Sequence, residues 1–117
     1  MTPEDGVREI EAALGEKLGG APQAVFSSRD RANLLSTLEG GRARLGEELG
    51  GVDGDDPELR YVFDEHLTGF VQSFLAATEG VDMQLQLVIG QDEPQLSLGP
   101  EGLAHVMGRI CPIHPWC

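Results

Sequence analysis

The side chains with the richest chemistry stand together at the end of the chain, in the segment Cys111-Pro-Ile-His-Pro-Trp-Cys117. Cys111, His114 and Cys117 are three residues apart, and thiolates and imidazoles are ligands that zinc and copper accept. The two prolines exclude a helix, and in an extended chain the three side chains do not meet at one ion. Binding of zinc or copper by this segment therefore requires a chain that turns at both prolines.

Three other interpretations of the same segment remain open. A disulfide between Cys111 and Cys117 also requires a turn, because an extended chain separates the two sulfurs by about 20 Å. Clustered cysteine, histidine and tryptophan are also typical of a ribosomally made, modified peptide; then 110–117 is the core, residues up to about Arg109 are a folded leader, and the partner is a modifying enzyme. The simplest interpretation is a closing β-strand that Trp116 anchors.

Acidic side chains form the second group with a chemical signature. The chain has 20 acidic and 8 basic residues, and its net charge is −12. Most of the acids lie in 46–117, where Arg60 and Arg109 are the only bases. Nucleic acid and anionic membrane need Lys and Arg for binding, so the charge argues against both and favours a basic protein partner. The expected contact residues are Glu47, Glu48, Asp53, Asp55, Asp56, Glu58, Asp64 and Glu65.

These features predict a small acidic binding protein, similar in kind to bacterial immunity proteins and inhibitors that bind a basic protein. We expect no enzyme, because no motif pairs a nucleophile with a base and an orienting group, and no phosphate-binding glycine loop is present. The N-terminus has no signal-peptide pattern, and no apolar run approaches the 18 or so residues of a membrane span. A cytoplasmic protein is expected.

The length predicts a single domain, 1–117, whose elements must position these residues. Its first part, 1–50, is predicted to be helical. Thr2-Pro3 begins a helix that ends at Gly19-Gly20, and a short strand is possible in 23–27. The sequence then predicts a helix that Ser28 caps and that ends at Gly40-Gly41, followed by a short helical piece over 42–49.

An acidic loop over 51–57 separates this part from 58–117, where a helix, a hairpin, a helix and a strand are expected. Asp56-Pro57-Glu58 begins the longest helix, which continues to about Thr78 and has a continuous apolar stripe. Apolar residues occupy every second position from Val81 to Ile89, as in a strand with one buried face, and 95–98 completes a hairpin. A helix then ends at Gly108, and 109–117 forms the closing strand.

The fold class expected from this order is α+β, with four to five helices packed on a small, mainly antiparallel sheet. The sheet consists of the hairpin 81–98 and the C-terminal strand. Helices that follow and precede strands in this irregular order are typical of that class.

Leu96-Ser97-Leu98-Gly99-Pro100-Glu101 is followed by Met107-Gly108, where a short helix is expected to end. This order resembles the LSLSPE-L stretch and the leucine-glycine helix end of a bacterial family, the domain of unknown function 4279. The resemblance covers 64–117, and His114 and Trp116 stand where that family has Asp and Tyr. The family has no established activity, so the resemblance implies only that 109–117 is a strand of the sheet.

Overall fold

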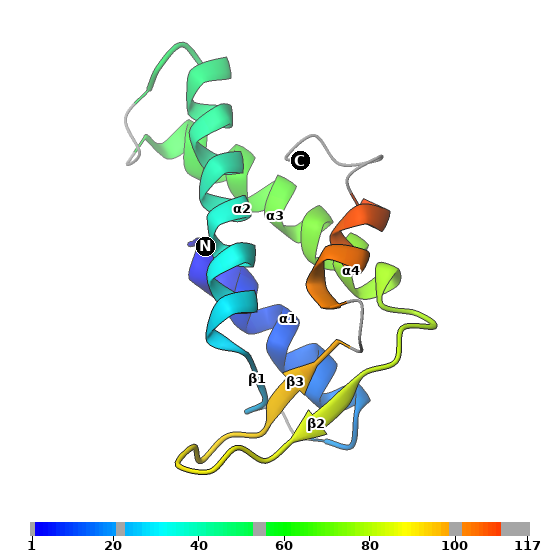
Figure 1. Ribbon diagram of the computed structural model, residues 1–117. Coiled ribbons are helices and arrows are strands. Elements are labelled where there is room, and N and C mark those ends of the chain that lie inside the picture. Colours follow the sequence, from blue (N-terminus) through cyan, green and yellow to red (C-terminus); the bar gives the residue numbers. More distant parts are fainter. Residues whose placement is uncertain (1, 21–22, 53–55, 99–101, 111–117) are drawn as a thin grey trace.

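The computed structural model describes residues 2–20, 23–52, 56–98 and 102–110. Within these residues it has four helices and one small sheet, which confirms the α+β class (Figure 1). None of these helices is long and apolar enough to cross a membrane. The elements are, in chain order, α1 (Pro3–Lys17), β1 (Val25–Phe26), α2 (Ser28–Glu48), α3 (Pro57–Ala77), β2 (Gln84–Gln86), β3 (Gln95–Ser97) and α4 (Gly102–Ile110).

The starts of α1 and α3 are where the sequence predicts them, because local hydrogen bonds define both. At α1 the Asp5 N–H donates to the Thr2 hydroxyl (3.3 Å) and the Thr2 N–H donates to the Asp5 carboxylate (2.9 Å), a complete capping box. At α3 the Asp56 carboxylate accepts from the N–H groups of Glu58 (2.9 Å) and Leu59 (3.4 Å). At α2 the cap is Ser27 rather than the predicted Ser28.

The prediction that Gly40-Gly41 ends a helix is wrong, because α2 continues through both residues to Glu48. Each glycine in a helix interior costs about 1 kcal/mol relative to alanine. Burial offsets that cost, since Leu34, Leu38 and Leu45 lie on one side of α2 and are all in the core. Tertiary packing of this stripe, rather than local propensity, therefore makes one long helix of two predicted ones.

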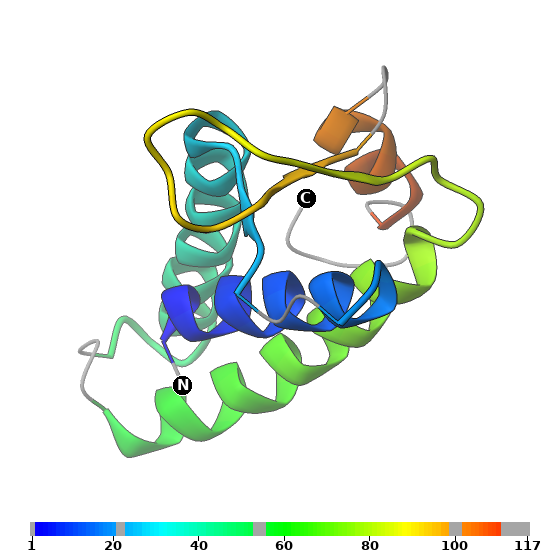
Figure 2. The same cartoon turned by 90° about the horizontal axis from the view of Figure 1, so that it is seen from below.

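The core lies between α1, α2 and α3, and the sheet and α4 also contribute buried residues to it. Figure 2 shows α1 running along α3, and the two helices approach so closely at Gly6 that a Cβ atom there would lie 2.6 Å from Cδ1 of Leu67. The buried Phe74 ring contacts Phe70 on its own helix and meets Phe26 of β1 edge-on, with ring centroids 6.1 Å apart. The predicted apolar stripe of α3 is thus the centre of the molecule.

The sheet has the order β1-β3-β2 and is mixed. The predicted hairpin is confirmed, since β2 pairs antiparallel with β3 and places Leu85 opposite Leu96. The possible strand in 23–27 is also present, and β1 pairs parallel with β3 so that Phe26 lies beside Leu96. The hydrogen-bonded part of β2 is shorter than the predicted strand over 81–89, and Leu87 and Ile89 are exposed rather than buried.

Helix α4 does not end at Gly108 but continues to Ile110, which is buried. Arg109, predicted to begin the closing strand, is also helical. Its guanidinium donates to the backbone oxygens of Ala77 (3.1 Å), the last residue of α3, and of Glu79 (3.0 Å), just after it. The first of these bonds supplies a partner at the helix end, where carbonyl groups lack one within the helix. The remainder of the predicted C-terminal strand, 111–117, lies outside the described residues.

Candidate functional site

Four of the predicted contact residues lie together where α2 ends and α3 begins. Figure 1 shows these two helix ends next to each other at one extremity of the molecule. Glu47, Glu48 and Glu58 are exposed, whereas Asp56 is half-buried because its carboxylate caps α3. We call this region, the last turns of α2 and the first turn of α3, the acidic end. Asp53 and Asp55 lie outside the described residues.

Asp64 and Glu65 are further along α3. Eight residues separate Asp64 from Asp56, which corresponds to about 12 Å along the helix axis. Glu65 is exposed, and Asp64 is half-buried. These two acids therefore extend the acidic surface along α3 instead of joining the cluster at the acidic end.

A hollow of about 500 Å³ opens at the acidic end. Its apolar surface includes Leu59 and Pro3, both buried, and the half-buried Val52. Two exposed carboxylates also line it, those of Glu39 and Glu47. The other residues around the hollow are Arg42, Ala43, Gly46 and Gly51.

Arg42 is the one base among the residues that line this hollow. Its guanidinium carbon lies 5.7 Å from the centre of the Phe63 ring, so the cation is held over an aromatic face of the core. Among the described residues, Glu39 and Glu47 take part in no ion pair. The hollow thus combines apolar side chains, two exposed carboxylates and the Arg42 side chain, whose guanidinium lies over the Phe63 ring.

Sequence reasoning missed Glu39. This acid is one turn before Ala43 and two turns before Glu47, on the same side of α2, but that relation exists only if the helix is continuous. Glu39 is not among the predicted contact residues because it lies in 1–45, outside the acidic part of the chain, and the predicted helix end at Gly40-Gly41 separates it from Glu47. The spacing of Glu39 and Glu47 by eight residues was the signal that could have found it.

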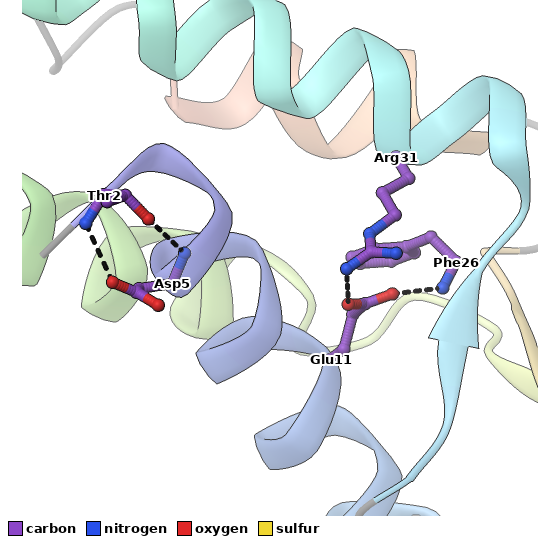
Figure 3. A network of polar contacts seen from close by, with 5 residues as sticks. All are labelled: Thr2, Asp5, Glu11, Phe26 and Arg31. Carbon is purple, nitrogen blue, oxygen red and sulfur yellow. Dashed lines mark hydrogen bonds and ion pairs between the residues drawn. The ribbon is translucent and has the colours of Figure 1, made fainter.

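A second carboxylate that the sequence did not single out lies at the junction of α1, β1 and α2. Glu11 is 3% exposed, and its Oε2 accepts a hydrogen bond from the Phe26 N–H (2.7 Å). Its Oε1 lies 3.6 Å from the Arg31 guanidinium (Figure 3). Burial raises the pKa of the Glu11 carboxyl, although the Phe26 N–H and the Arg31 charge act in the opposite direction. Glu11 thus serves the fold, since it satisfies a buried backbone group.

The C-terminal candidates, Cys111, His114, Trp116 and Cys117, lie outside the described residues. Binding of zinc or copper and peptide modification there stay predictions. Within the part of the chain that the structure describes, no three His, Cys, Asp or Glu side chains are grouped so that they could hold a metal ion. Ile110, the first residue of the predicted modified core, belongs to α4 and is buried, so the folded body extends through it.

No family model matches the chain, and no curated protein or solved structure is significantly similar to it. The resemblance of 64–117 to the domain of unknown function 4279 therefore stays a prediction. The residues of the acidic end are therefore the basis for a function.

Proposed function

We propose that this chain is a small non-enzymatic binding protein, immunity- or inhibitor-like, which presents the acidic end to a basic protein partner. The observation that supports this function best is the hollow with Glu39 and Glu47 at its edge. A lysine or arginine side chain of the partner enters it, its aliphatic part against Leu59 and Val52 and its charged group at the two carboxylates. Long basic side chains combine these two kinds of contact in their ordinary chemistry.

The surrounding acids have a different role in this proposal. Glu48, Glu58 and Glu65 are exposed, and charges at the edge of an interface mainly accelerate association. Glu39 and Glu47 contact the anchoring side chain directly, so their loss accelerates dissociation. Affinity then depends on the hollow, and the rate of association depends on the wider acidic surface.

The test uses N-acetyl-arginine amide as the probe and N-acetyl-citrulline amide as its neutral analogue of nearly the same shape. NMR titration of the full ¹⁵N-labelled chain is expected to show shifts of backbone amides near Glu39, Glu47 and Leu59 with the arginine probe. Binding should weaken as salt is raised, because the interaction is between charges. Equal binding of the citrulline probe would contradict the proposal.

Two glycines of α2 supply a matched pair of variants. A Cβ atom at Gly46, which lines the hollow, would have its nearest contacts at 3.7 Å, an ordinary distance, whereas one at Gly40 would meet nothing within 4 Å. Gly46→Val is therefore expected to reduce the volume of the hollow and abolish probe binding, and Gly40→Val to leave binding unchanged. Circular dichroism checks that both variants fold, and Glu39→Gln/Glu47→Gln should also abolish binding without any added volume.

A further inference from the structure

The hairpin exposes two large apolar side chains that a folded domain would ordinarily bury. Leu87 is 90% exposed, and Ile89 is completely exposed. Leu87 follows directly after β2, one of the two edge strands of the sheet, and Ile89 lies in the turn that comes next. Figure 1 shows the segment between β2 and β3 (yellow) projecting from the end of the molecule opposite the acidic end.

The sequence of this segment suits a longer strand than the one that is paired. Apolar residues alternate with other residues from Val81 to Ile89, but β2 comprises only Gln84–Gln86. Val81, Met83 and Leu85 pack partly against the core, whereas Leu87 and Ile89 lie beyond it and are exposed. A strand edge with exposed apolar residues is the surface to which a further strand adds.

The charge of the hairpin indicates what kind of strand would add to the edge of β2. Asp82, Asp92 and Glu93, which belong to the same hairpin region as Leu87 and Ile89, are exposed. The sequence has no Lys or Arg between Arg60 and Arg109. A second copy of this chain, with its net charge of −12, would bring acid against acid at this edge.

We propose that the outer edge of β2, together with Leu87 and Ile89 beyond it, binds an extended segment of a partner in which apolar residues alternate with Lys or Arg. The backbone of that segment pairs with 84–87, before the turn at 88–91. Its apolar side chains cover Leu87 and Ile89, and its cations face Asp82, Asp92 and Glu93. This surface lies far from the acidic end and shares with the proposed function only the positive charge of the partner.

The test uses an acetylated and amidated peptide of eight residues in which Lys and Val alternate, titrated into the full ¹⁵N-labelled chain. We expect amide shifts over 84–89 together with slower hydrogen exchange at 84–87. A peptide with Glu in place of Lys, and one with Ser in place of Val, should not produce these shifts. Failure of the Lys-Val peptide to shift 84–89 would overturn the inference.

Two variants separate this surface from the acidic end. Leu87→Ser/Ile89→Ser changes exposed residues only. It is expected to lower the affinity for the peptide at least about tenfold, because burial of even one such side chain changes affinity by about that factor. Glu47→Gln/Glu48→Gln/Glu58→Gln should change the affinity at 84–89 less than about twofold, since these acids are far from the hairpin. Unchanged affinity in the serine variant would overturn the inference.

Two further outcomes distinguish this inference from the proposed function. Shifts confined to the acidic end would overturn the inference and leave the proposed function in place. Self-association of the free protein through Leu87 and Ile89, seen as a doubled mass in analytical ultracentrifugation and lost in the serine variant, would also overturn it, because the occupant would then be a second copy.

Discussion

Carboxylates have opposite roles in two regions of this molecule. At the junction of α1, β1 and α2, Glu11 is almost completely buried and bonded to the Phe26 N–H. At the acidic end, Glu39 and Glu47 are exposed and, among the described residues, take part in no ion pair. Counting charges along the sequence treats all three acids alike. The comparison shows that burial separates the acids that hold the fold from those that remain available to a partner.

Asp56 combines features of both regions. It belongs to the acidic end by position, yet its carboxylate accepts two backbone hydrogen bonds at the start of α3. We therefore expect the loss in free energy of unfolding on removing a carboxylate to be largest for Glu11, smaller for Asp56 and smallest for Glu39 and Glu47. Four measurements test that order.

The largest loss is expected for Glu11→Ala, which leaves the buried Phe26 N–H without its acceptor. An unsatisfied buried donor costs about 1 to 3 kcal/mol of the free energy of unfolding. Glu11→Gln is the control, because the amide oxygen can still accept a hydrogen bond from the Phe26 N–H. Its loss in free energy of unfolding should be less than half that of Glu11→Ala. Urea unfolding of both variants measures the difference. Equal losses would show that the charge of Glu11, and not its hydrogen bond, is what matters.

Asp56→Ala is expected to lower the free energy of unfolding by about 1 kcal/mol, the usual cost of losing a helix N-cap. Asp56→Asn keeps a side-chain oxygen at the cap and removes the charge, so its free energy of unfolding should be close to that of the parent protein. The same unfolding experiment compares the two. A loss in the asparagine variant as large as in the alanine variant would show that the charge at this position, rather than the cap, stabilises α3.

The pH dependence should have opposite signs for two acids of α1. Burial raises the pKa of Glu11, so its favourable contribution is fully present below the unfolded pKa, about 4.3, and is lost as pH rises through the folded value. Hydrogen bonds with the backbone and side chain of Thr2 lower the pKa of Asp5, so its contribution is present above about pH 3.9 and is lost as pH falls.

The free energy of unfolding of the parent protein minus that of Glu11→Gln should therefore decrease as pH rises from 4 to 7. The corresponding difference for Asp5→Asn should decrease as pH falls below about 3.9. Urea unfolding over this range measures both differences. A difference for Glu11 that increases with pH would mean that the Phe26 N–H and Arg31 outweigh burial.

The smallest effect on stability is expected for Glu39→Gln/Glu47→Gln, a change of at most about 0.5 kcal/mol, as for most surface substitutions. This variant should lose binding of the arginine probe at the same time. A large loss of stability would place these carboxylates with Glu11 as structural groups and remove the contrast between the two regions.

Part of the candidate site could be predicted from the sequence. Glu47, Glu48, Asp56 and Glu58 were expected because the charge is concentrated in this half of the chain. Glu39 was not, because it lies outside that half. Its position beside Glu47 depends on a continuous α2, which the long-range burial of Leu38 and Leu45 maintains. The hollow itself could not be predicted, since it lies between α2, Val52 and residues of two other helices.

The sequence by itself determined the features that depend on neighbours a few residues away. Thr2 and Asp56 mark helix starts because their partners are two or three residues further on. The alternation over 81–89 indicates a strand for the same reason.

Only the tertiary structure decided the parallel pairing of β1 with β3, the burial of Glu11 and the exposure of Leu87 and Ile89. Each depends on which distant segment lies opposite. A pattern of polar and apolar residues indicates that a face suits burial. Packing across the whole chain decides whether another element covers that face.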